Sequence, residues 1–246
     1  MSRSSLLLTT ALLAAAAPAM AASTPPAPVV TEQQVILPAD GPYEIDLENL
    51  KGRVVVRDWN KNVAYVRAEK RATHALGASE ADLFTQAKPT VWHQQGEVAI
   101  RTDWGAAAKT YPAVLLAKTP HVVVDYTVVV PPETVLRLKQ EQGDVVLYGV
   151  DGRFEVTVRD GAIAATALKG RLEATTERGD VTVSALEGDA VVTSQTGDLR
   201  FREVAGDLRA RTHSGEVRID VGPRFAGEVS FHTVSGDFRS DLATYS

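Results

Sequence analysis

The second half of the chain repeats one pattern of apolar and polar residues every nine positions. The residues two and four positions after the start of each repeat are apolar, whereas those between them are mostly Thr, Ser, Glu and Arg. Each repeat starts with a glycine, at Gly143, Gly152, Gly161, Gly170, Gly179, Gly188, Gly197, Gly206 and Gly215. Alternation with period two predicts a short strand with one buried face, and the glycine before it predicts a bend.

The corners between these strands show that the structural repeat is twice as long. Two residues before alternate glycines the chain has Val150, Leu168, Leu186 and Val204, and before the others it has Glu141, Arg159, Glu177, Gln195 and His213. A coil therefore has two strands, two unlike corners and about eighteen residues. Such coils stack in parallel at roughly 4.8 Å. We predict a parallel β-solenoid over residues 133–246, with about five coils between residues 143 and 240.

Residues 41–132 are expected to form strands and one short helix that cap the first end of the solenoid. The alternating segments 54–59 and 63–69 flank the turn Asn60-Lys-Asn62 and predict a β-hairpin. The single predicted helix is 79–87, with Ser79 as its N-cap.

The rest of this part predicts further strands and one long loop. Residues 90–92, 97–103 and the Val-rich segment 121–130 have strand patterns. Residues 105–120 predict a long loop, in which Ala113–Ala117 either packs as a lid or is exposed to a partner. The fold class is therefore all-β.

The first 40 residues have the pattern of an export signal followed by a linker. Arg3 precedes an apolar run at 6–17, and Ala19 and Ala21 are the small residues expected before a cleavage site. We predict a signal peptide over residues 1–21 and a Pro/Ala-rich linker over 22–40. The run is too short to span ~30 Å of hydrocarbon, so no transmembrane segment is expected. Cleavage near Ala21 would leave a periplasmic, secreted or cell-surface protein.

Composition excludes several classes of chemistry. The 246 residues include no cysteine, which excludes disulfides, thiolate zinc sites, cysteine nucleophiles and lipoprotein acylation. With 31 acidic and 26 basic side chains the net charge is -5, which argues against a nucleic-acid partner.

Several segments together resemble the bacterial putative-adhesin (toastrack) domain family. They are Leu47-Glu-Asn-Leu-Lys-Gly-Arg-Val-Val-Val, Trp59-Asn-Lys-Asn, Val124-Asp-Tyr-Thr-Val-Val-Val-Pro131, Thr196-Gly-Asp198 and Ser235-Gly-Asp237. The resemblance implies a β-helix-like module of the cell envelope with a role in adhesion or envelope-stress sensing. The family has no defining catalytic or binding motif whose residues could be assigned to positions of this sequence.

Arginines in the last coils are the main candidate binding surface. Arg200, Arg202 and Arg218 are expected on the outside of one wall, and Arg209 and Arg211 on the other. They either form a solvated face offset by nearby acids or bind an anionic envelope ligand such as a lipid headgroup, lipopolysaccharide or a peptidoglycan carboxylate.

Acidic residues recur after the glycines, in one column of Asp144, Asp180, Asp198 and Glu216 and a second of Asp189 and Asp207. An aspartate in this position favours a turn by accepting hydrogen bonds from backbone amides. The alternative is a bound cation. The Gly-Gly-x-Gly-x-Asp unit of calcium-binding β-rolls is absent from this sequence, so we favour the turn.

No catalytic, cofactor or metal-binding constellation is recognised. The five histidines have no metal-ligand spacing, and His213-Ser214 occupies a corner, where solvation is expected. Trp59, Trp92 and Trp104 could line a sugar site, but packing is the preferred interpretation.

We therefore predict a non-enzymatic envelope scaffold or adhesin-like interaction module without a cofactor. Its partner would be an envelope protein, a glycan or a lipid headgroup, and it could self-associate through its C-terminal edge, with Phe238 facing inward and Arg239 outward. The alternative is a carbohydrate-active enzyme or glycan-binding β-helix that acts on envelope polysaccharide.

Overall fold

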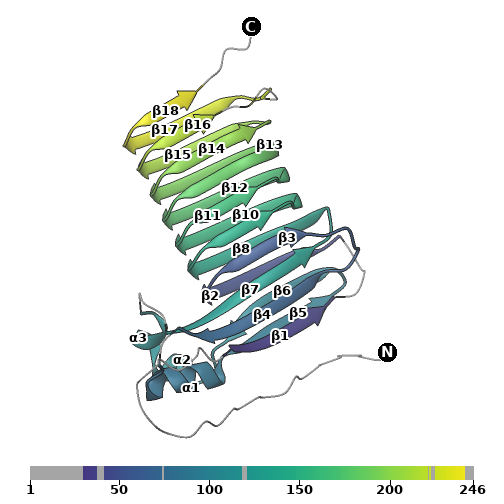
Figure 1. Ribbon diagram of the computed structural model, residues 1–246, viewed down its shortest axis with the longest axis vertical. Helices are drawn as coiled ribbons and strands as arrows, with labels where there is room; N and C mark the ends of the chain where they lie inside the picture. Colours follow the sequence, from purple (N-terminus) through teal and green to yellow (C-terminus); the bar gives the residue numbers. More distant parts are fainter. Residues whose placement is uncertain are drawn as a thin grey trace, which may run out of the picture.

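The structure is a two-walled stack of strands with helices at one end and the C-terminal strands at the other (Figure 1). The computed structural model describes residues 30–37, 42–73, 75–117, 121–220, 222 and 225–241. The predicted signal peptide lies outside the described residues. None of the described helices is long and apolar enough to cross a membrane.

Each wall is a sheet in which strands distant in sequence lie side by side. The first wall contains, in spatial order, β5 (Lys88–Gln94), β6 (Glu97–Asp103), β2 (Glu44–Lys51), β8 (Thr134–Gln142), β10 (Asp151–Asp160), β12 (Lys169–Arg178), the second half of β13 (Val181–Thr196), β15 (Leu208–Ser214) and β17 (Val229–Ser235). The second wall contains β1 (Val30–Ile36), β4 (Tyr65–Ala72), β7 (Val122–Val130), β3 (Val54–Asp58), β9 (Val145–Tyr148), β11 (Ile163–Thr166), the first half of β13, β14 (Leu199–Val204), β16 (Val217–Asp220) and β18 (Phe238–Asp241). All neighbours are parallel except β5–β6, β1–β4 and β4–β7.

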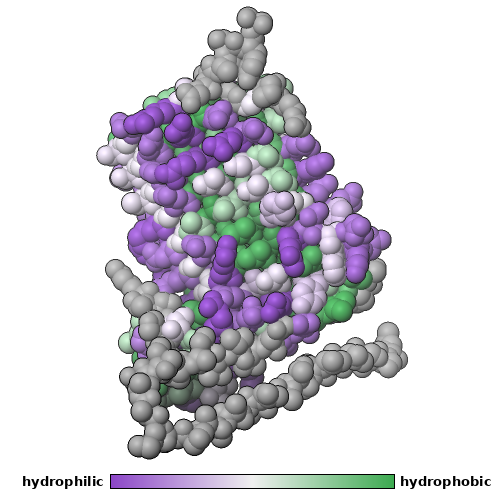
Figure 2. All heavy atoms as spheres, in the orientation of Figure 1, coloured by the Kyte–Doolittle hydropathy of each residue, from purple (hydrophilic) through white to green (hydrophobic). Residues whose placement is uncertain are grey.

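The predicted parallel β-solenoid is confirmed, with about six turns spaced about 18 residues apart. Phe154 on β10 pairs with Leu172 on β12, which pairs with Ala190 on β13, so the register advances by two of the nine-residue repeats per coil. All apolar positions of the nine repeats are buried, and so are the four apolar corner residues. One core therefore runs through the stack, from Leu37 to Ile219. On the face shown in Figure 2, the outward side chains near the C-terminal coils are mainly hydrophilic.

Glycines stack upon one another at the corners, as their spacing predicts. At Gly197, φ is +148° and an added Cβ would overlap the carbonyl oxygen of Gly179 in the coil before. The same column continues to Gly52, since a Cβ at Gly143 would overlap the Gly52 carbonyl oxygen. A coil thus has no room for a side chain at this corner.

The first deviation from expectation is that part of the N-terminal region belongs to the solenoid. Strands β2 and β3 form a coil that lies between β6–β7 on one side and β8–β9 on the other. The predicted hairpin at Asn60–Asn62 is wrong, because β7 lies between β3 and β4 and pairs with both. The hairpin of the cap is instead β5–β6, which turns at Gln95 and Gly96, both with positive φ.

The cap also contains more regular structure than expected. Strand β1 lies within the segment predicted as linker, where it pairs with β4. The predicted helix is present as α1 (Ala78–Gln86), but it starts after Gly77, whose N–H donates to the Glu80 carboxylate at 2.7 Å, and not at Ser79.

The helix is not single, since the segment predicted as a loop contains two short helices, α2 (Ala107–Thr110) and α3 (Pro112–Leu115). Of the apolar residues in the segment Ala113–Ala117, Leu115 is buried, whereas Leu116 is exposed, and a partner at this segment stays a prediction.

Candidate functional site

The five candidate arginines lie on opposite walls of the solenoid. Arg200 on β14 pairs in register with Arg218 on β16, and Arg218 with Arg239 on β18, so the second wall carries a column of three arginines. Arg209 and Arg211 lie on β15 in the first wall. The five therefore cannot form one binding surface.

Acidic neighbours compensate much of the charge on the second wall. The Arg200 guanidinium lies 3.2 Å from the Asp180 carboxylate and 2.7 Å from that of Asp198. The hydrogen bond with Asp180 raises the pKa of Arg200 further above its ordinary value. Arg202 faces Asp220 at 3.9 Å. Such exposed pairs add little stability, but they reduce the positive potential available to a ligand.

The corner aspartates connect successive coils. Asp180 Oδ1 accepts a hydrogen bond from the Asp198 N–H, and Asp198 Oδ1 accepts one from the Glu216 N–H, both at 2.9 Å. At the other corner Asp189 accepts from the Asp207 N–H at 2.9 Å. The aspartates thus bind backbone amides, as the turn interpretation expects, but the amide belongs to the next coil. Among the described residues no three acidic or histidine side chains gather where they could hold a metal ion.

This geometry predicts a stability that does not depend on calcium. We expect the melting temperature to stay the same with EDTA and with millimolar calcium, because the Asp198 oxygen already binds a backbone donor. Asp198→Ala should lower the free energy of unfolding by about 1 kcal/mol through loss of that partly buried hydrogen bond. Thermal unfolding checks both, with Asp220→Ala as the control. A rise of several degrees with calcium would contradict the turn interpretation.

On the first wall, the last three coils form a hollow of about 600 Å³. We call it the basic hollow; its main lining residues are Thr193, Gln195, Arg211, His213, Phe231 and His232. Thr193, Arg211 and His232 share one outward column, because β13, β15 and β17 pair in parallel. An adjoining hollow of about 180 Å³ extends the lining to Arg209.

The basic hollow presents an exposed cation, and the exposed aromatic ring of the last strand of this wall lies on the opposite face of the wall. Arg211 makes no ion pair within the part of the chain that the structure describes, and the nearest acidic contact of Arg209 is Asp207 at 3.7 Å. Phe231 is 43% exposed although it continues the inward column of Ala210, because no described strand lies beyond β17. Its ring stacks on Phe238 with centroids 3.7 Å apart.

The two C-terminal residues singled out from the sequence have the orientations expected. Phe238 continues the column of buried Val217, and Arg239 continues the outward column of Arg218 and lies 3.0 Å from Glu216. Self-association through this edge stays a prediction.

The tryptophans do not gather at one sugar site. The Trp59 indole N–H donates to the Val63 carbonyl, and its ring packs on Tyr65. Trp92 is half exposed on β5, and Trp104 is buried after β6. Each has its own surroundings, as the packing interpretation expects.

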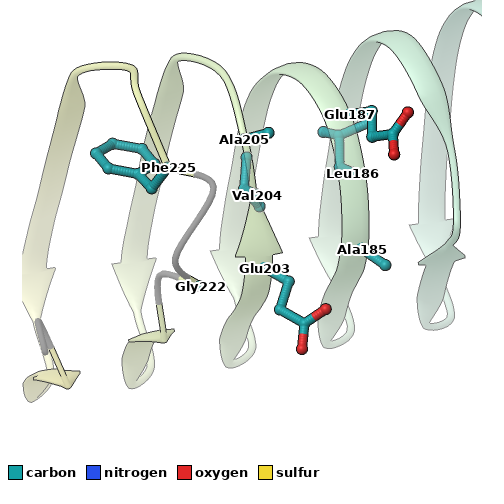
Figure 3. Close-up of a pocket in the computed structure, with 8 residues that line it drawn as sticks. All are labelled: Ala185, Leu186, Glu187, Glu203, Val204, Ala205, Gly222 and Phe225. Atoms are coloured by element: carbon teal, nitrogen blue, oxygen red, sulfur yellow. The ribbon is translucent and has the colours of Figure 1, made fainter. Parts of the chain in front are cut away.

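A further cavity of about 240 Å³ lies at the apolar corner of the late coils (Figure 3). Its lining includes Leu186, Val204 and Phe225. The Glu187 and Glu203 carboxylates lie at opposite ends of it and do not converge on one point. A site of acid–base chemistry would need converging groups, so we place the candidate site in the basic hollow.

Comparison with known proteins identifies the repeat region. Residues 134–246 match the family model described as Toastrack DUF4097, and no curated protein matches the chain.

Among solved structures, the chain is similar to a putative adhesin from Bacteroides fragilis, with 12% identity, 85% of this chain and 96% of the other covered, and a TM-score of 0.48. A putative lipid binding protein from Parabacteroides distasonis has 12% identity, coverage of 86% and 96%, and a TM-score of 0.35. A putative cell adhesion protein from Clostridium sporogenes has 8% identity, coverage of 86% and 99%, and a TM-score of 0.37. The match over residues 134–246 confirms the resemblance to the toastrack family that the sequence segments indicated.

Proposed function

We propose that the protein is a non-enzymatic, adhesin-like interaction module of the bacterial cell envelope, exported to the periplasm or cell surface, and that it binds an acidic glycan in the basic hollow. The observation that carries the proposal is the position of Arg211, which has no ion pair among the described residues, in the outward column with Thr193 and His232.

The chemistry of the hollow suits a sugar that bears a carboxylate. A guanidinium binds a carboxylate through two parallel hydrogen bonds, which favours Arg211 as the anion ligand. His232, which follows Arg211 in the outward column, adds an imidazole group that can hydrogen-bond a sugar hydroxyl. Thr193, Gln195 and Ser230 supply hydroxyl and amide groups that can hydrogen-bond sugar hydroxyls.

The lining also favours binding over cleavage. Glycoside hydrolysis ordinarily uses two carboxyl groups that flank the bond, about 5 to 10 Å apart. None of the described residues that line the basic hollow is acidic. The carbohydrate-active enzyme that the sequence left as the alternative would need carboxylates there.

The test compares an acidic and a neutral polysaccharide on the full chain. We expect polygalacturonate to retard the protein in affinity electrophoresis and dextran to have no effect, with the retardation weakened by salt. Arg211→Gln should weaken binding about tenfold, since a charge-assisted hydrogen bond contributes about 1.5–3 kcal/mol. Arg200→Gln is the matched control, because it removes the same charge from the opposite wall.

Two results would overturn the proposal. One is equal retardation of Arg211→Gln and the unmodified protein, which would place the binding elsewhere. The other is release of unsaturated or reducing sugar from polygalacturonate, which would establish the enzyme alternative.

A further inference from the structure

A second cavity, at the opposite end of the molecule from the basic hollow, contains a buried lysine. Lys51 is the last residue of β2 and is only 2% exposed. Its ammonium group donates one hydrogen bond, to the Ala117 carbonyl oxygen at 2.7 Å. An ammonium group has three donors, and no acidic side chain pairs with Lys51 in the part of the chain that the structure describes. The positive charge is therefore buried without a counter-ion there.

The surroundings of Lys51 form a pocket of about 270 Å³ beneath the helices of the cap. Most of its lining is apolar, with Leu83 from α1, Trp104, Val114 and Leu115 from α3, and Val122 from β7. This volume is below the range of drug-sized sites, which begins at about 300 Å³, so the pocket suits a small molecule.

The carboxylate in the lining has other partners. Glu80 Oε2 accepts the Gly77 N–H at 2.7 Å at the start of α1, and Glu80 Oε1 contacts His121 Nδ1. Both oxygens of Glu80 therefore serve groups other than Lys51.

Lys70, the other buried lysine of the cap, has a structural role. Lys70 donates to the Phe84 carbonyl at 2.6 Å and to the Ala87 carbonyl at 3.0 Å, so it binds the free carbonyls at the end of α1. Its ammonium group also lies over the Phe84 ring. Lys51 Nζ donates to one carbonyl oxygen only, and Lys51 lines a cavity. Its other N–H donors are therefore available to a ligand.

We propose that this pocket binds a small organic carboxylate with an apolar chain, whose carboxylate pairs with Lys51 Nζ and whose chain lies against Trp104 and Leu115. One buried ammonium group matches one negative charge, whereas a phosphate dianion would need further donors. The apolar walls favour an aliphatic body over a sugar. The ligand would neutralise the cation and fill the pocket in one step.

The test uses hexanoate and 1-hexanol, which share a chain and differ in charge. We expect hexanoate, measured by calorimetry on the full chain, to bind at least tenfold more tightly than hexanol and to raise the melting temperature. Lys51→Met, which keeps the length of the side chain, should abolish this preference. Lys109→Met, an exposed lysine on α2, should keep it.

The outcomes separate a ligand site from a structural lysine. Failure of hexanoate to bind, or equal binding to Lys51→Met, would overturn the proposal. Should Lys51→Met fail to fold, Leu115→Trp fills the same pocket and leaves the lysine in place. Unchanged hexanoate affinity in Leu115→Trp would equally overturn the proposal. None of these results bears on the basic hollow, because its strands β13, β15 and β17 lie at the other end of the stack.

Discussion

Gly197→Val is expected to lower the free energy of unfolding by at least ~2 kcal/mol, whereas Thr182→Val should change it by no more than ~0.5 kcal/mol. Gly197 has a φ of +148°, which valine adopts only under strain, and its Cβ would overlap the Gly179 carbonyl oxygen. Thr182 lies on the outer face of the second wall, where a methyl group replaces a hydroxyl without crowding. Urea unfolding of the three proteins measures both differences.

The comparison tests the coil model itself. Gly179→Val should behave like Gly197→Val, because a Cβ at Gly179 would overlap the Gly161 carbonyl oxygen in the same way. Equal stability of Gly179→Val and Thr182→Val would mean that the glycines do not stack, and the coil model would fail.

The solenoid was predictable because residues that pair between neighbouring coils are separated by two nine-residue repeats of the sequence. Each residue pairs with the residue about 18 positions later, so a local pattern determines a long-range contact. The coil β2–β3 was missed, since Gly52 stacks on Gly143 across 91 positions of sequence. A signal was present nevertheless: Gly52 has Val54 and Val56 two and four residues later, which is the pattern of every repeat.

The strand pairing of the cap could not be obtained in this way. The Asn60–Asn62 segment has turn composition, and it does form a bend, but β4 pairs with β7 and not with β3. An antiparallel partner fifty or more residues away is chosen by packing against the first coil, which no local pattern encodes. The same is true of β1, whose sequence alone looked like linker.

The candidate site was predictable only in part. The nine-residue offset between Arg200 and Arg209 correctly places them on different walls. The hollow beside Arg211 was missed because the last coil is longer: Gly215 stacks under Gly236, 21 residues later, so Phe231 and His232 fall outside the repeat. The Lys51 pocket had no signal, since a lysine at the end of a strand is ordinarily exposed.

Lys51→Met is expected to stabilise the protein at pH 7 and to lose that advantage as the pH rises. Burial, aided by the charge of Arg159, lowers the pKa of Lys51 from 10.5 to about 8. Between these two values the unfolded chain binds more protons than the folded one, so the stability of the unmodified protein increases with pH over that window. Below pH 8 both states hold the proton, and the cost of burying the charge is present in full.

The expected size follows from the same pKa values. At 1.36 kcal/mol for each pKa unit, Lys51→Met should be more stable by up to about 3 kcal/mol at pH 7, and the difference should shrink towards zero near pH 10.5. Urea unfolding at pH 7 and pH 10 measures it, and other titrating groups cancel because the two proteins are compared at each pH. Lys109→Met, which removes an exposed charge, should show no such window. A difference between Lys51→Met and the unmodified protein that stays constant from pH 7 to pH 10 would show that folding leaves the pKa of Lys51 at its ordinary value, so that its charge is not destabilised by burial.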